Sequence, residues 1–170
     1  MGKRHSIDIE METMNDMVMD TAVVTLREIT ADTVREICKL SVAESQKNFV
    51  APNAVSIAEA YFCDKAWFRA IYADETPVGF VMLYDDPHDP EGPVYYLWRF
   101  MIAAEHQGKG YGRRALELLI EQGRNRPDVD KFELSCVPAE GGAEAFYEKL
   151  GFKRNGKWDD DEVCMELALK

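Results

Sequence analysis

The chain has 170 residues, 46% of them hydrophobic and 30% charged, which is the size and apolar content of one compact globular domain. Its 20 basic and 31 acidic residues give a net charge of -11, which disfavours binding to nucleic-acid phosphates and suits a cationic ligand. The four cysteines lack metal-ligand spacing, and the N-terminus has no apolar run of signal-peptide or membrane-span length. We therefore expect a cytoplasmic protein with reduced thiols, no metal and no membrane partner.

The first residues show no sustained hydrophobic period. Residues 1–20 mix charges with methionines, so we interpret them as an N-terminal extension and assign the expected domain to residues 21–170. Alternating apolar and polar residues then predict a first strand at 22–29.

Two short helices are expected next. Thr30 or Asp32 can cap a helix whose apolar positions begin at Val34, and Ser56 can start a second helix that ends near residue 63. We expect these helices and the link between them to form a flap, separate from the hydrophobic core.

A hairpin and a long apolar strand follow. Residues 66–73 and 78–84 predict two strands joined by a turn, and 85–93 is a loop rich in Pro, Asp and Gly. Residues 94–102 are aromatic or apolar almost throughout, which is typical of a central strand covered on both faces.

The last third alternates helices and strands. Apolar residues at helical spacing predict a helix from Gly112 that ends near Gly123, and a further helix at 143–150. Strands are predicted at 131–136 and in a closing hairpin of 152–158 and 163–169.

A glycine-rich turn between the central strand and the long helix is the first candidate site. It consists of Gln107, Gly108, Lys109, Gly110, Tyr111 and Gly112. Backbone amides at the start of a helix carry partial positive charge, and glycines let an anion approach closely, so the turn is suited to a phosphate or diphosphate. The turn matches neither the GxxxxGK[ST] loop nor the full GxGxxG pattern, and a helix start without a ligand is the alternative interpretation.

The order of elements around this turn resembles the GNAT superfamily of N-acetyltransferases. The resemblance rests on Gln-Gly-Lys-Gly-Tyr-Gly at 107–112 and Phe-Tyr-Glu-Lys-Leu-Gly-Phe at 146–152, and it covers about 23–169. It implies an α/β (α+β) fold with a mixed, mostly antiparallel sheet of six to seven strands and about four helices. It also implies transfer of an acetyl group from acetyl-CoA to an amine.

The resemblance also implies how the cofactor is held. The amides of residues 107–112 would grip the CoA pyrophosphate, and Arg113 would add positive charge. Phe100, Met101 and Ile102 would lie on a strand edge that pairs with the pantetheine arm, with an amide near Met101 polarising the thioester carbonyl.

The same resemblance gives Tyr147 the role of proton donor to the departing thiolate. The alternative is that Tyr147 simply packs in the core, because it shares a helical face with Phe146 and Leu150. One departure from the family pattern is Glu140, which stands where many relatives have a cofactor-contacting asparagine.

The acceptor amine is less well defined by the sequence. Residues 42–51 and 74–80 look most like bacterial diamine and polyamine acetyltransferases, and the acidic composition suits spermidine or spermine. The candidate substrate-binding residues are Glu44, Phe49, Tyr84, Asp85 and Trp98, placed around a mouth between 44–53 and 85–93. Core packing is the alternative for Trp98.

No carboxylate occurs in 94–102, where a general base is common in this superfamily. The base is therefore either water relayed to a carboxylate such as Glu44, Asp85 or Asp86, or absent because the amine arrives deprotonated. Acetylation of a protein N-terminus, a lysine or an amino-sugar compound, and a CoA-binding sensor without turnover, are the other readings. Homodimerisation is left open.

Overall fold

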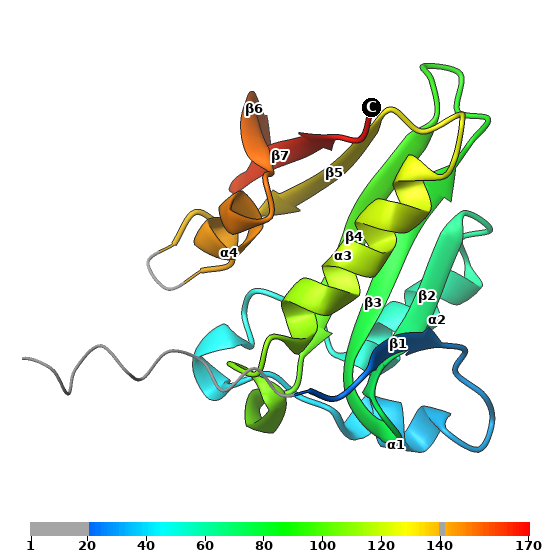
Figure 1. Ribbon diagram of the computed structural model, residues 1–170, viewed down its shortest axis with the longest axis vertical. Helices are drawn as coiled ribbons and strands as arrows, with labels where there is room; N and C mark the ends of the chain where they lie inside the picture. The colour runs from blue at the N-terminus through cyan, green and yellow to red at the C-terminus, as the bar shows by residue number, and fades with distance from the viewer. Residues whose placement is uncertain (1–20, 140–141) are drawn as a thin grey trace, which may run out of the picture.

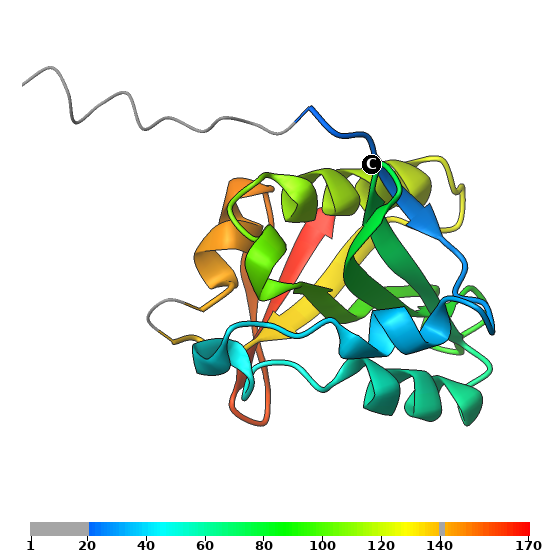
Figure 2. The same ribbon diagram turned by 90° about the horizontal axis from the view of Figure 1, so that it is seen from below.

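The computed structural model describes residues 21–139 and 142–170, and within them a twisted sheet lies between two layers of helices (Figure 1, Figure 2). The strands are β1 (Val24–Arg27), β2 (Ala66–Ala73), β3 (Thr76–Asp86), β4 (Val94–Ile102), β5 (Lys131–Cys136), β6 (Lys153–Asp159) and β7 (Glu162–Ala168). The helices are α1 (Val34–Lys39), α2 (Asn53–Tyr61), α3 (Tyr111–Arg124) and α4 (Glu144–Lys149), with 3₁₀ turns η1 (Glu44–Gln46) and η2 (Ala104–His106). None of the helices in the described ranges is long and apolar enough to cross a membrane.

The sheet has seven strands in the order β1-β2-β3-β4-β5-β7-β6. Every neighbouring pair is antiparallel except β4 and β5, which run parallel. The expected α/β fold with a mostly antiparallel sheet is confirmed. The extension proposed at 1–20 and the departure at Glu140 lie outside the described residues.

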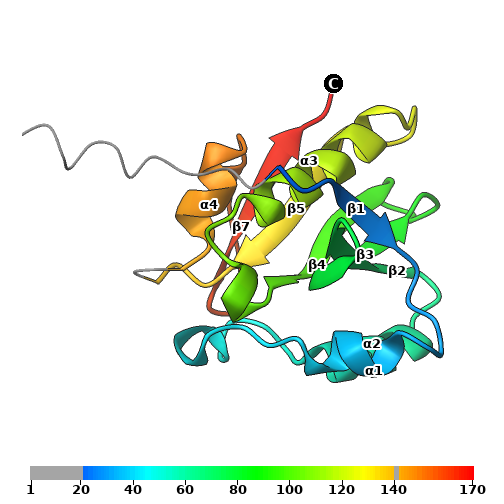
Figure 3. The ribbon, with the colours of Figure 1, turned by 60° about the horizontal axis from the view of Figure 1, so that its bottom comes forward.

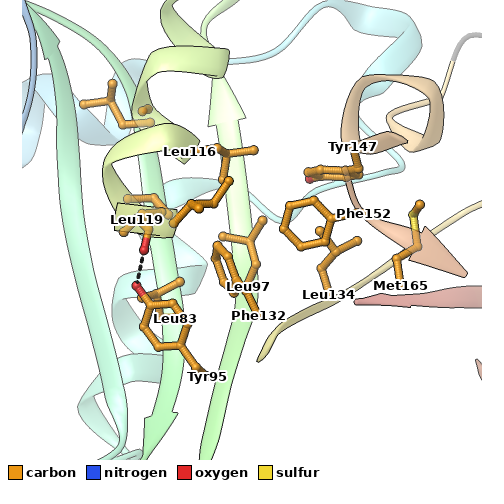
Figure 4. Close-up of a cluster of buried hydrophobic side chains, with 14 of the residues drawn as sticks. Leu83, Tyr95, Leu97, Leu116, Leu119, Phe132, Leu134, Tyr147, Phe152 and Met165 are labelled. Atoms are coloured by element: carbon orange, nitrogen blue, oxygen red, sulfur yellow. Dashed lines mark hydrogen bonds between the residues drawn. The ribbon is translucent and has the colours of Figure 1, made fainter. Parts of the chain in front are cut away.

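The larger core fills the space between the sheet and α3 (Figure 4). The apolar stripe of α3, Ala115, Leu116, Leu119 and Ile120, is buried as its helical spacing predicts. Gly123 is the last residue but one of α3, which ends near it as expected. An added Cβ there would lie 2.7 Å from Leu169 Cδ1 and 3.0 Å from Tyr95 Cε1, so this glycine lets the helix approach the sheet closely.

The other face of β2, β3 and β4 is covered by α1 and α2, as Figures 2 and 3 show. The expectation of a flap was wrong for these two helices. Ile37 of α1 is fully buried in a second apolar cluster with Phe80 and Met82, and the buried amide of Asn53 donates to the carbonyl of Ile37 at 2.9 Å. The link between the helices also contributes to this cluster, because Val42 and Val50 pack against it.

The starts of α1 and α2 also differ from expectation. No side chain caps α1 at Thr33, and α2 begins at Asn53 directly after Pro52, so Ser56 is buried inside the helix. Proline fits the first positions of a helix because its fixed φ and missing N–H cost nothing there.

The contact between β4 and β5 is short. Only Tyr96 with Glu133 and Leu97 with Leu134 are in register, and the strands then diverge (Figure 1). A bulge in the β3–β4 ladder places Trp98 as an extra residue, because Met82 pairs with Arg99 and Leu83 with Leu97. Bulges bend a strand and redirect its side chains, so the bulge coincides with the point where β4 leaves β5.

Candidate active site

The glycine-rich turn leads from η2 into the first residue of α3. Gly108 and Gly110 have φ values of +75° and +79°, the left-handed region that glycine adopts without strain. An added Cβ at either position would meet no atom within 4 Å, so open space lies in front of the turn. The turn therefore exposes backbone where a ligand can reach it.

Most amides of this turn remain available. Within the described part of the chain, no hydrogen bond uses the backbone N–H groups of Gly108, Lys109, Gly110, Gly112 or Arg113. They precede or begin a 14-residue helix, whose N-terminal end carries roughly half a positive charge. This donor set fits an anion of diphosphate size.

Side chains hold the turn in place. Gln107 donates through Nε2 to Gln46 Oε1 at 2.8 Å and to the Ile102 carbonyl at 2.9 Å, which ties η1 and the end of β4 to the turn. Arg114 donates to the carbonyls of Lys109 at 3.3 Å and Gly110 at 3.4 Å. Sequence reasoning missed Arg114, whose only signal was its place one turn into the helix.

Arg113 lies on the exposed side of α3. Its guanidinium pairs with Glu117 at 2.8 Å, one helical turn further on. An exposed pair of this kind contributes only a few tenths of a kcal/mol, about 0.3–0.5, so it does not prevent Arg113 from turning toward an anion.

The end of β4 lies beside the turn. Phe100 and Ile102 belong to the larger core, whereas Met101 is buried in the cluster under α1 and α2. Beyond Leu97 the β5-facing edge of β4 has no strand partner in the described chain. This edge can accept an extended ligand as an additional strand.

Helix α4 approaches the turn from the opposite side of the divergence. Phe146 of α4 stacks on Phe100 of β4 with ring centres 6.2 Å apart, and an added Cβ on Gly112 would lie 3.4–3.6 Å from Ile102, Phe146 and Phe100. The turn, the β4 edge and the helix that carries Tyr147 therefore meet at one place.

Tyr147 lies in the core, as one of the two interpretations of the sequence expected. Its ring is buried against Phe152, 5.9 Å away, in the larger core (Figure 4). Its hydroxyl has no hydrogen-bond partner among the described residues, where Arg99 Nε is the single fully buried side-chain nitrogen or oxygen without one. Burial raises the pKa of Tyr147 above its ordinary value, which keeps the hydroxyl protonated.

The candidate substrate residues do not share one mouth. Segment 44–53 is tied to the glycine-rich turn through Gln46, whereas the 87–93 loop joins the opposite ends of β3 and β4. Seven residues of β4 separate Ile102 from Tyr95, which is about 23 Å at 3.3 Å per residue. The expectation that 44–53 and 85–93 form one mouth was therefore wrong.

The five residues divide into three groups. Glu44 and Phe49 are exposed in the link near the turn, where Glu44 pairs with Lys47. Tyr84 and Trp98 are half-buried on β3 and β4, and Tyr84 is the register partner of Tyr96. Asp85 forms an ion pair with Arg126 beyond the end of α3, at 2.6 Å, and so lies apart from the other four.

A polar cluster at the start of the β4–β5 divergence was also missed. The Tyr96 hydroxyl lies 2.6 Å from Ser135 Oγ of β5, and Ser135 in turn donates to the carboxylate of Glu162 on β7. These residues come from three strands far apart in the sequence, so no local pattern could have joined them.

Comparison with known proteins agrees with this geometry. A family model described as the acetyltransferase (GNAT) family matches residues 25–152. The spermine/spermidine N(1)-acetyltransferase of Bacillus subtilis (strain 168) is 27% identical over 141 residues, which cover 80% of this chain and 91% of that protein.

Solved structures show the same fold. A spermidine N-acetyltransferase from Vibrio cholerae, in complex with CoA and spermine, superposes with a TM-score of 0.68 at 18% identity, covering 86% of this chain and 95% of the other. An aminoglycoside acetyltransferase in complex with coenzyme A also has a TM-score of 0.68, at 21% identity and the same coverage. At these identities the likeness concerns the fold.

Proposed function

The chain belongs to the acetyltransferase (GNAT) family and is an acetyl-CoA-dependent N-acetyltransferase, and on this premise we propose that its acceptor is a polyamine such as spermidine or spermine. The observation that carries the polyamine proposal is the 27% identity to a spermine/spermidine acetyltransferase over most of both chains. The acidic composition agrees with it, because a net charge of -11 attracts polycations.

For the donor, we propose that the amides at 107–112 and the start of α3 hold the CoA pyrophosphate. The unpartnered amides and the open space in front of Gly108 and Gly110 support this assignment. The pantetheine arm would lie along Phe100, Met101 and Ile102, in the gap between β4 and β5. Tyr147 would then donate its hydroxyl proton to the departing sulfur.

For the acceptor, we propose the face of the sheet that α1 and α2 leave uncovered, over β5 and β7 (Figure 3). Asp159 and Glu162 are register partners there and form no ion pair within the described chain. Trp98 of β4, which also packs partly against the cluster under α1 and α2, and Tyr84 of β3 are half-buried, so their remaining aromatic surface could pack against a methylene chain or an ammonium group. Asp85, paired with Arg126, has no part in this proposal.

We expect spermidine or spermine to show a higher kcat/KM than a monoamine of similar reach, and the difference to shrink as salt is added. Exposed charges attract over about 10 Å at 0.1 M salt and over less at higher concentration. Initial rates of thiol release with both amines, measured from low to high salt, test this expectation. Equal kcat/KM values at low salt would rule out the polyamine.

The same assay separates the other readings. A preference for a peptide N-terminus, a peptide lysine or an amino-sugar compound would identify another acceptor class for the same donor site. Tight CoA binding without thiol release for any amine would indicate a sensor. Each result leaves the fold and the family unchanged.

A further inference from the structure

An ammonium acceptor must lose a proton before its nitrogen can attack. With a pKa near 10.4, only about one alkylamine in a thousand or fewer is neutral at pH 7, which corresponds to about 4–5 kcal/mol. The strand that could supply a base, β4, has no carboxylate. The carboxylates considered from sequence are engaged elsewhere: Glu44 with Lys47, Asp85 with Arg126, and Asp86 with Lys65 at 3.6 Å.

We propose that Glu162 is the general base of this enzyme and receives the proton of the attacking ammonium through Ser135 and Tyr96. The proposal rests on the proposed function, because it presumes an amine acceptor on this face of the sheet. The hydrogen-bonded chain of Tyr96, Ser135 and Glu162 carries it.

The direction of each hydrogen bond in this chain is fixed. An ionised carboxylate can only accept, so Ser135 donates its single proton to Glu162. Ser135 must then accept from Tyr96, whose hydroxyl lies 2.6 Å away. The lone pairs of the Tyr96 oxygen therefore remain available to accept a hydrogen bond from an ammonium N–H.

The hydrogen-bonded residues Tyr96, Ser135 and Glu162 lie where an amine acceptor could reach them. Tyr96 and Leu97 are the two residues of β4 in register with β5, so the Tyr96 side chain lies where the two strands begin to diverge. Ser135 lies two residues beyond the register partner of Tyr96, which places both on one face of the sheet. Tyr147 belongs to the core on the other face, so the proposed acid and base approach the gap from opposite sides.

Proton transfer along this chain balances without a further reactant. The ammonium proton moves to Tyr96, the Tyr96 proton to Ser135, and the Ser135 proton to Glu162, which leaves a neutral amine and a protonated carboxyl. As the new N–C bond forms and the C–S bond breaks, the sulfur takes the Tyr147 proton, and the second proton from nitrogen restores Tyr147. One proton then leaves Glu162 for solvent.

The electrostatic surroundings favour relay through Tyr96 over Tyr96 acting as a base itself. Burial, with a smaller contribution from the charge of Glu162, raises the pKa of Tyr96, although the bond to Ser135 opposes the shift. Asp159 of β6 is the register partner of Glu162, and Cys164 of β7 and Tyr96 of β4 lie on its face of the sheet, whereas Cys136 of β5 and Tyr147 of α4 interact with its charge from the core face. Two cations act on the neighbouring thiols: Arg154, which pairs with Glu144, on Cys136, and Lys157 on Cys164.

The test compares kcat/KM for spermidine as a function of pH in the wild type and in Glu162→Gln and Ser135→Ala. We expect both variants to lose at least about 100-fold near pH 7, because general base catalysis contributes roughly 10²–10⁴-fold. The loss should shrink below about tenfold near the pKa of the amine, where the acceptor arrives neutral. Ser135→Thr keeps the hydroxyl and should keep most of the rate.

A matched control removes a charge from the same strand and face. Glu166 is the register partner of Glu133 and takes no part in the proposed relay. The pH profile of the Glu166→Gln variant should therefore keep the wild-type shape. CoA affinity and thermal unfolding of each variant show whether the fold is retained.

Three results would overturn the relay. These are a loss of equal size at every pH, no loss in the Glu162→Gln variant, or an equal effect of Glu166→Gln, which would indicate attraction of the substrate by charge alone. If the wild type acetylates a different amine, the same comparison is made with that amine. If the wild type acetylates no amine, the proposed function fails and the relay fails with it.

Discussion

Replacing Gly110 with glutamate should weaken CoA binding by at least about 100-fold while leaving the fold intact. Gly110 has φ +79° and faces open space, so the new side chain would project into the region where we place the pyrophosphate. Hydrogen bonds to charged groups contribute about 1.5–3 kcal/mol each, so the loss of two, together with repulsion between anions, corresponds to that factor or more. Calorimetric titration with CoA measures the change.

Gly156→Glu is the matched control for this variant. Gly156 has a similar φ of +85°, also faces open space, and lies in β6, outside the glycine-rich turn. Both variants place glutamate in the left-handed region, at a cost of roughly 1–2 kcal/mol in stability. The control should lose that stability and keep its affinity for CoA. If Gly110→Glu also bound CoA with unchanged affinity, the turn would not be the pyrophosphate site.

Tyr147→Phe should lower kcat by roughly 10²–10⁴-fold with little change in CoA affinity, because it removes one hydroxyl and keeps the ring. The hydroxyl has no partner among the described residues, so its removal should change stability by less than about 1 kcal/mol. Since burial raises the pKa of Tyr147, the acid stays protonated, and kcat of the wild type should not fall on the alkaline side below about pH 10. Single-turnover rates across pH measure both effects.

Tyr95→Phe provides the comparison for a tyrosine in the same core. The Tyr95 hydroxyl donates to the Leu119 carbonyl at 2.9 Å, so this variant should lose about 0.5–1.5 kcal/mol of stability and keep its turnover (Figure 4). A Tyr147→Phe variant with nearly full rate, when chemistry limits turnover, would assign Tyr147 to packing alone.

Hydrophobic pattern and glycine placement were sufficient to predict most elements. The expected ranges 66–73, 94–102 and 131–136 coincide with β2, β4 and β5, because strand alternation and apolar runs are properties of adjacent residues. The start of α2 at Asn53 was missed because Ser56 offered a plausible cap. The helical position of Ile37 was expected, but its burial was missed because the two short helices were assigned to a flap. Local signals therefore defined the elements better than their packing.

The candidate site was likewise predictable only where its residues form contiguous motifs. The glycine-rich turn could be identified as a contiguous motif, and Tyr147 from a second one. Their assembly with the β4 edge depends on the bulge at Trp98 and on the register between β4 and β5, which only the folded sheet specifies. The contact between Ser135 and Glu162 likewise depends on β7 pairing with β5.

The brief pairing of β4 with β5 also bears on the mechanical behaviour of the molecule. Strands β1 to β4 and strands β5 to β7 meet through only two register pairs in the described chain, between β4 and β5. A ligand that lies between β4 and β5 as an extra strand would add contacts between these two groups of strands. A ligand that binds only the folded state stabilises it, by about 2.7 kcal/mol at a hundred times its Kd. Bound acetyl-CoA would therefore also raise the free energy of unfolding. The stability of the β4–β5 contact would then fall when CoA leaves and rise again when acetyl-CoA binds.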